Sequence, residues 1–120
     1  MGAGLYCDQE AGSAGSTGRG ESAILSNGSF AIVELMRQGA SPEQAGLEVL
    51  RRIVRQVQRQ ASWQPALMRE DGTPNFGVNF YALDMQGHWA GVTLRGANRK
   101  FAVADPENGV RLERLTPLLG

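Results

Sequence analysis

Apolar residues recur at helical spacing in the first half of the chain. Between residues 21 and 38 they return every three or four positions, and Gly39 stands where a glycine commonly follows the end of a helix. We therefore predict one helix over residues 21–38 with a single buried face. The residues of that face are Ile24, Gly28, Ala31, Ile32, Leu35 and Met36.

A second helix is predicted to begin directly after Ser41. Ser41 is a good N-cap, Pro42 suits the first turn, and Gln44 stands where its side chain can complete a capping box. The predicted buried stripe is Ala45, Val49, Leu50, Ile53, Val54 and Val57. The opposite face carries Arg51, Arg52, Arg55, Gln56 and Arg59, which we interpret as a solvated helix surface.

Strands are predicted at both ends of the chain. Residues 76–83 have the alternating pattern of a strand, with apolar residues on both of its faces. A turn at residues 85–87 leads into a second strand over 89–94, so the two segments predict a β-hairpin. Because both faces of the first strand carry apolar residues, we expect the sheet to be covered on both sides. Two further strands are predicted over residues 100–104 and 110–114, while residues 60–74 form a connecting loop.

The N-terminal segment is built almost wholly of small residues. Residues 11–17 contain only alanine, glycine, serine and threonine, which propensity alone would assign to a loop but which can also form a strand packed tightly against a neighbour. The predicted order is a small-residue strand, two helices and an antiparallel β-meander. This is an α+β fold in one domain or part of one.

Composition and charge exclude several classes of partner. The 120 residues include twelve basic and twelve acidic side chains, so no net field favours nucleic acid or an anionic membrane. Cys7 and His88 are the only cysteine and histidine, so no disulfide framework, metal cage or cofactor is predicted. No transmembrane run or signal peptide is present in the sequence. The compartment stays open, with the cytoplasm as the default.

The segment Thr17-Gly18-Arg19-Gly20 is the sharpest chemical feature. It lies between the predicted small-residue strand and the first helix, where backbone N–H groups favour a carboxylate or an oxyanion. The Thr17 hydroxyl and the Gly18 N–H are the pair of donors that an oxyanion hole requires. A tight glycine turn would explain the same residues. Cys7 has no histidine nearby in the sequence, so we expect a small buried or half-buried thiol and not a nucleophile.

Several segments, in order along nearly the whole chain, resemble the β subunit of the glycosylasparaginases. These are threonine-dependent N-terminal-nucleophile amidohydrolases, related to the isoaspartyl peptidase and L-asparaginase enzymes. The segments that carry the resemblance are residues 2–8, 11–21, 33–39, 41–45, 80–84, 101–103 and 111–113, together with Gly87.

The resemblance implies a specific fold and activity. The fold is part of an αββα sandwich, and the reaction is hydrolysis of the side-chain amide of glycosylated asparagine, plain asparagine or an isoaspartyl substrate. A threonine whose own α-amine acts as base is the implied nucleophile. The implied oxyanion donors are Thr17 and Gly18, with Arg19 and Gly20 completing the substrate-binding segment. Family members are typically oligomeric.

The resemblance also implies that important parts lie upstream of Met1. In the family, the nucleophilic threonine and an Arg/Asp segment that binds the substrate precede the region that matches this chain. Thr17, Thr73, Thr93 and Thr116 are internal and have no free amine, so no catalytic nucleophile is assigned. We expect a fragment without the α subunit and the leading part of the β subunit, inactive and marginally stable by itself because a sheet edge stays unpaired.

Overall fold

The computed structural model describes residues 1–120 and shows a mixed α+β fold. The strands are β1 (Leu5–Asp8), β2 (Gly12–Gly18), β3 (Val78–Asp84), β4 (Trp89–Arg95), β5 (Lys100–Asp105), β6 (Gly109–Arg114) and β7 (Thr116–Leu119). The helices are α1 (Gly20–Ser26), α2 (Gly28–Arg37), α3 (Pro42–Gln60) and the short 3-10 helix η1 (Pro65–Leu67).

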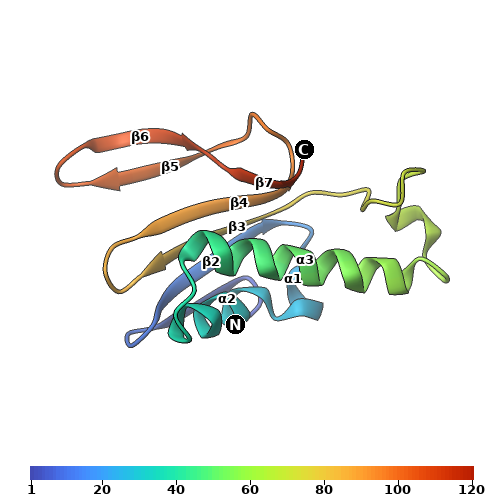
Figure 1. The fold of residues 1–120 in the computed structure, drawn as a ribbon, viewed down its shortest axis with the longest axis horizontal. Coiled ribbons are helices and arrows are strands. Elements are labelled where there is room, and N and C mark those ends of the chain that lie inside the picture. The colour runs from blue at the N-terminus through green and yellow to red at the C-terminus, as the bar shows by residue number, and fades with distance from the viewer.

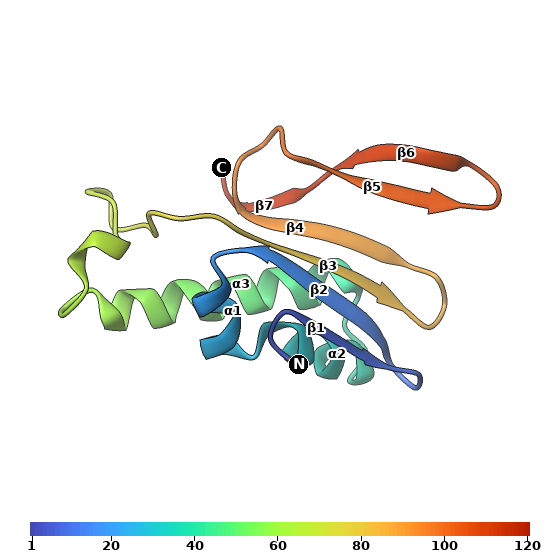
Figure 2. The ribbon, with the colours of Figure 1, turned by 180° about the vertical axis from the view of Figure 1, so that it is seen from behind.

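One five-stranded sheet organises the molecule. Its strand order is β1-β2-β3-β4-β7, with antiparallel neighbours except for the parallel pair of β4 and β7. Helices α2 and α3 lie against one face of this sheet (Figure 1). The opposite face, turned toward the viewer in Figure 2, has no α2 or α3 over it, and β5 and β6 form a separate hairpin that rises beyond β4. The predicted small-residue strand and the predicted hairpin of β3 and β4 are confirmed.

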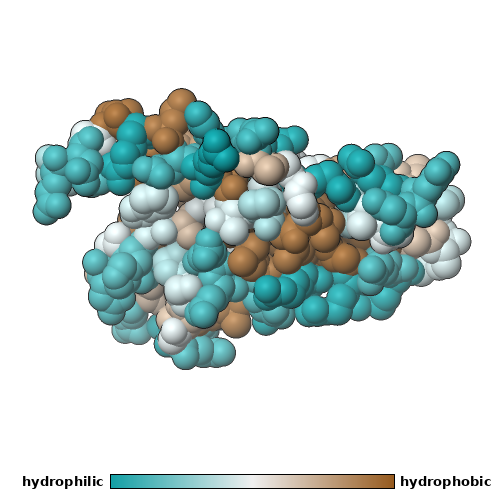
Figure 3. Space-filling view, turned by 45° about the horizontal axis from the view of Figure 1, so that its top comes forward, coloured by the Kyte–Doolittle hydropathy of each residue, from teal (hydrophilic) through white to brown (hydrophobic).

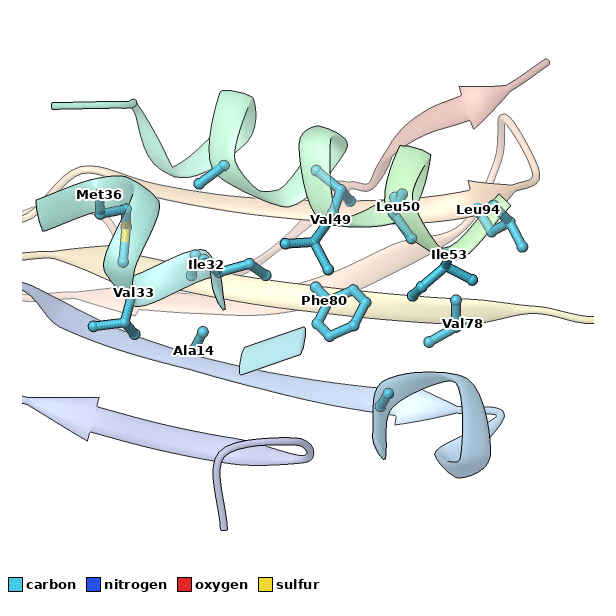
Figure 4. Close-up of a cluster of buried hydrophobic side chains, with 14 of the residues drawn as sticks. Ala14, Ile32, Val33, Met36, Val49, Leu50, Ile53, Val78, Phe80 and Leu94 are labelled. Carbon is cyan, nitrogen blue, oxygen red and sulfur yellow. The ribbon is translucent and has the colours of Figure 1, made fainter. Parts of the chain in front are cut away.

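The hydrophobic core lies between the sheet and the two longer helices (Figure 4). Alternate residues of β3, Val78, Phe80 and Ala82, point toward the helices and are buried. Two glycines let the helices come close to the sheet. A Cβ on Gly46 of α3 would lie 2.7 Å from a methyl carbon of Val92, and a Cβ on Gly28 of α2 would lie 2.5 Å from the ring of Phe80.

Helix α3 begins as the sequence predicts. The Ser41 hydroxyl accepts a hydrogen bond from the Gln44 N–H, and the Gln44 side chain accepts one from the Ser41 N–H, each at 3.1 Å. The predicted stripe faces the core, with Val54 partly buried and the other members buried. On the outer face, Arg51, Arg52 and Arg55 form ion pairs with Glu48 and stay largely exposed, which confirms the solvated face for these residues. Gln56 of the same face instead donates to the Leu25 carbonyl at 3.2 Å.

The prediction of one helix over residues 21–38 is wrong. Asn27 adopts a left-handed backbone conformation with φ 48° and divides the segment into α1 and α2. The Ala3 carbonyl accepts from the Ser29 N–H, and the Gly2 carbonyl accepts from the Phe30 N–H, so a distant segment satisfies the first donors of α2. As a result the Ile24 side chain, predicted to be buried, is 68% exposed.

The predicted meander is also only partly correct. Strands β5 and β6 pair with each other, as predicted, but β5 does not continue the sheet beside β4. That position is taken by β7, which the sequence analysis did not identify, as it did not identify β1. The rings of Phe101 and Trp89 pack against each other, which places the hairpin over part of the helix-free face.

An ion-pair cluster connects β1 to α2. Arg37 forms ion pairs with Asp8, Glu10 and Glu34. The pKa of Asp8 is held below its usual value, first by the hydrogen bond that the Glu10 N–H donates to its carboxylate and then by the hydrogen bond from Arg37.

This cluster predicts a pH-dependent contribution to stability. A carboxyl group whose pKa is lower in the folded state stabilises the fold above its unfolded-state pKa and loses that contribution as the pH falls through the folded-state value. We expect Asp8→Asn to lower the midpoint of urea unfolding at pH 7. The difference should shrink below about pH 4, the ordinary aspartate range. Equal differences at pH 7 and at about pH 2.5 would show that the charge of Asp8 contributes nothing.

Candidate functional site

The four residues predicted to bind substrate lie together around one cavity. Thr17 and Gly18 are the last two residues of β2, Arg19 is the N-cap of α1, and Gly20 is its first residue. The cavity has a volume of about 340 Å³. Its other lining residues are Met1, Ala3, Gly4, Ser16, Ala23 and Ile24. The sequence motif therefore forms one wall of a real concave surface.

The Gly18 N–H is a free donor because of the register of β2. In an antiparallel pair, hydrogen-bonded and non-hydrogen-bonded residue pairs alternate. The Arg19 N–H donates to the Gly77 carbonyl at 3.0 Å, so the Gly18 N–H points away from β3 and toward the β1 side. There β1 begins only at Leu5, opposite Gly15, and no acceptor within the protein receives this N–H.

Position 18 also requires glycine. Gly18 has φ +105°, and a Cβ there would lie 2.5 Å from the Gly77 carbonyl oxygen. Both the backbone conformation and the close approach of β3 exclude a side chain. The free N–H at the end of β2 therefore depends on glycine at this position.

The Thr17 hydroxyl belongs to a small polar cluster on β2 and β3. Its Oγ1 lies 3.0 Å from the Tyr81 hydroxyl oxygen, and the Asn79 amide donates to it at 3.4 Å. A hydroxyl has one proton to donate and can accept two hydrogen bonds. When Tyr81 and Asn79 both donate to Thr17, the Thr17 proton is free to reach an anion in the cavity.

Arg19 and Gly20 contribute differently from Thr17 and Gly18. The Arg19 guanidinium pairs with Glu21 at 2.6 Å and lies over the Phe76 ring, 5.1 Å from its centre. Gly20 is exposed, and α1, which it begins, contains only seven residues, so the dipole of that helix is small. The Gly18 N–H at the end of β2 therefore adds to the first N–H groups of α1, which no side chain caps.

Asn79 and Tyr81 are site residues that no sequence motif indicated. Both lie on the helix-free face of β3, and Asn79 is the register partner of Thr17. Because Asn79 and Tyr81 alternate with Val78 and Phe80 along the strand, the sequence alone shows that these two residues share one face. Only the pairing of β2 with β3 places them beside Thr17, because the partners are 62 and 64 residues apart along the chain.

The other chemically reactive side chains lie elsewhere. Cys7 is exposed, which corrects the expectation of a buried or half-buried thiol. His88 pairs with Asp84 at 2.9 Å at the turn between β3 and β4, as a hairpin residue would. No three His, Cys, Asp or Glu side chains come together in an arrangement that would hold a metal ion. None of the helices has both the length and the apolar character needed to cross a membrane.

Comparison with known families gives this geometry a context. The Asparaginase_2 family, described as asparaginase, matches residues 1–90, a segment that includes Thr17, Gly18, Asn79 and Tyr81. This chain belongs to the asparaginase family.

Individual relatives lie in both branches that the resemblance named. The chain is 40% identical over 114 residues to the N(4)-(β-N-acetylglucosaminyl)-L-asparaginase of Elizabethkingia miricola, covering 94% of the chain and 30% of that protein. It is 29% identical over 118 residues to the probable isoaspartyl peptidase/L-asparaginase 3 of Arabidopsis thaliana, covering 98% of the chain and 28% of that protein.

A putative N(4)-(β-N-acetylglucosaminyl)-L-asparaginase of Drosophila yakuba is 39% identical over 83 residues, which cover 69% of the chain and 20% of that protein. The chain thus spans less than a third of the length of these relatives.

Proposed function

We propose that these residues form part of an amidohydrolase that cleaves the side-chain amide of glycosylated asparagine. Thr17 and Gly18 act as the oxyanion donors, and Arg19 and Gly20 complete the segment that contacts the substrate. The observation that supports this proposal is the position of the unpaired Gly18 N–H and the Thr17 hydroxyl beside one cavity at the end of β2.

The proposed donors act on charge that develops during acyl transfer. When a nucleophile attacks the amide carbon, the carbonyl oxygen becomes negatively charged in the tetrahedral intermediate. Two donors fixed by the strand bind that oxygen more strongly than they bind the neutral carbonyl of the substrate. Because the Gly18 N–H is part of the backbone and Thr17 is held by two neighbours, little reorganisation is needed at the moment of reaction.

The remaining machinery is assigned to polypeptide outside these residues. The resemblance implies a threonine nucleophile with a free α-amine, together with an Arg and an Asp that bind the α-carboxylate and α-amine of the substrate. In this proposal an α subunit and the leading part of the β subunit supply these groups. The assembled enzyme is an oligomer.

The αββα sandwich is part of the same proposal. The helix-free face of the sheet and the β5–β6 hairpin enclose a mainly apolar cavity of about 620 Å³. Leu5, Tyr81, Trp89 and Phe101 line it. A second sheet stacked at this face would bury these side chains, as sheet-on-sheet packing requires. That second sheet would also pair with the free edges of the hairpin.

A substrate panel tests the proposed function. The full-length protein that carries these residues should release aspartate from N(4)-(β-N-acetylglucosaminyl)-L-asparagine, and L-asparagine and a β-aspartyl dipeptide serve as alternative substrates. A higher kcat/KM for either alternative would move the protein to the asparaginase and isoaspartyl peptidase branch. Hydrolysis of none of the three would contradict the amidohydrolase proposal.

A non-enzymatic pairing or scaffold fragment is the alternative function. Exposed apolar side chains on the hairpin favour it, with Val110 82% and Leu112 66% exposed, and brown patches mark this hairpin at the upper left of Figure 3. Denaturant unfolding of the 120-residue chain alone distinguishes the two proposals. Cooperative unfolding without a partner would favour the independent fragment, and aggregation would favour a piece of the larger hydrolase.

A further inference from the structure

Three arginines surround a second polar cavity. Arg69, Arg95 and Arg99 line a space of about 330 Å³ together with Asn75, Phe76, Gly77 and Gly96. No acidic residue lines this cavity, and none of its lining residues lines the cavity beside Thr17. This cavity is therefore separate from the proposed oxyanion site, and the proposed hydrolysis does not explain it.

These arginines differ from most others in the chain because they have no carboxylate partner. Arg19, Arg37, Arg51, Arg52, Arg55 and Arg111 each form at least one ion pair. The arginines without such a pair are Arg59, Arg69, Arg95, Arg99 and Arg114. Three of those five line this one cavity. In a chain with balanced charges, this is a local excess of positive charge.

Arg95 is held in place but incompletely hydrogen-bonded. It lies at the end of β4, partly buried, and its Nη2 donates to the Thr73 hydroxyl at 2.5 Å. Its Nε is buried and has no hydrogen-bond partner in the protein. A buried N–H of a charged group without an acceptor is costly, so the positive charge of Arg95 is incompletely compensated within the protein.

Arg99 reaches the same cavity from the loop after β4. A Cβ on Gly96 would lie 3.0 Å from the Arg99 Nε, and a Cβ on Gly77 would lie 3.8 Å from its Nη2. The guanidinium of Arg99 therefore lies against two residues that have no side chain. This arrangement leaves its donors accessible at the cavity wall.

One acidic side chain lies next to the cluster. The pKa of Asp71 is lowered, first by hydrogen bonds from the Thr73 hydroxyl and N–H and then, more weakly, by the charges of Arg95 and Arg69. Asp71 bonds to Thr73, and Thr73 in turn bonds to Arg95. Three guanidinium groups and one carboxylate leave a surplus of two positive charges.

We propose that this cavity binds a doubly charged tetrahedral oxyanion of the phosphate class. A dianion neutralises the surplus charge, and guanidinium groups donate paired N–H bonds to oxyanions in a fixed geometry. Arg95, which Thr73 holds in place, donates from the inner wall of the cavity, and Arg69 and Arg99 donate from its exposed side. The ligand is a free small anion.

Titration with inorganic phosphate tests this site. The full-length protein is titrated calorimetrically at constant ionic strength, with sodium chloride as the balancing salt. We expect saturable binding with which sulfate competes and acetate does not. Arg99→Ala should weaken phosphate binding about tenfold, the loss of one charge-assisted bond of about 1.4 kcal/mol or more. Arg59→Ala is the matched control, because it removes an exposed, unpaired arginine away from the cavity and should leave the affinity within about twofold.

A second variant keeps the test independent of folding. Arg95→Lys retains the positive charge but removes the planar guanidinium group, and it should weaken phosphate binding while the circular dichroism spectrum stays unchanged. Equal weakening by Arg59→Ala and Arg99→Ala would overturn the proposal, because the effect would then follow net charge. Absence of saturable phosphate binding at matched ionic strength would also overturn it. Either result leaves the amide-hydrolysis proposal unaffected.

Discussion

Thr17→Ala is expected to reduce kcat for the proposed amide hydrolysis by about 100- to 1,000-fold, the usual effect of removing one oxyanion donor. The hydroxyl binds the oxygen only after it becomes charged, so kcat should fall more than KM rises. The methyl group that alanine retains leaves the β2 backbone unchanged, and the Gly18 N–H remains in place. Steady-state kinetics with the best substrate of the panel measures this effect.

Thr17→Ser and Tyr81→Phe serve as the matched controls. Serine keeps the hydroxyl and should retain most of the activity. Phenylalanine at position 81 removes the hydroxyl that is hydrogen-bonded to the Thr17 Oγ1 but leaves the Thr17 hydroxyl itself, so the loss should be about tenfold or less. Unchanged kcat in Thr17→Ala would exclude the hydroxyl as an oxyanion donor.

Phe80→Ala is expected to destabilise the fold by about 3–5 kcal/mol, the range for removing a buried phenylalanine side chain. Phe80 is 1% exposed and lies at the centre of the contact between the sheet and the helices (Figure 4). Its ring fills the space above Gly28, so truncation leaves a cavity beneath the start of α2. The free energies of unfolding of the variant and the parent protein, both measured in urea under the same conditions, give the loss of stability.

Gly28→Ala provides a double-mutant cycle for the same contact. Alone, its Cβ would overlap the Phe80 ring at 2.5 Å and should destabilise the protein. Combined with Phe80→Ala, the same methyl group enters the vacated space, so the double variant should be more stable than the sum of the single effects. Additive effects would show that Phe80 and Gly28 do not pack against each other in solution.

Local signals in the sequence were sufficient for some elements. The capping box at Ser41 and Gln44 depends on residues three positions apart, and the alternation along β3 and β4 depends on neighbours, so both were predicted correctly. The break at Asn27 could not be found this way. It depends on the carbonyls of Gly2 and Ala3, which reach α2 only in the folded chain.

The edge strands and the site show the same limit. The four residues of β7 carry no clear alternation, and they become a strand only because β4 offers a free edge. For the candidate site, the motif at Thr17 and Gly18 could be found from its residue types and its resemblance. The contribution of Tyr81 required the register of β2 with β3, and the cavity of three arginines is assembled from segments far apart along the chain.

The short length of β1 is the reason that the Gly18 N–H stays unpaired. If β1 continued toward the N-terminus in the same register, residue 2 would stand opposite Gly18 and its carbonyl would receive the Gly18 N–H. Instead the Gly2 N–H donates to the Leu5 carbonyl, and the Gly2 carbonyl is bonded to the Phe30 N–H of α2. The start of α2 thus acts as a stop for the edge strand. Substitutions that loosen this attachment would let the Gly18 N–H, a donor in the proposed oxyanion site, pair with the Gly2 carbonyl as an ordinary sheet amide, although no residue that lines the cavity need change.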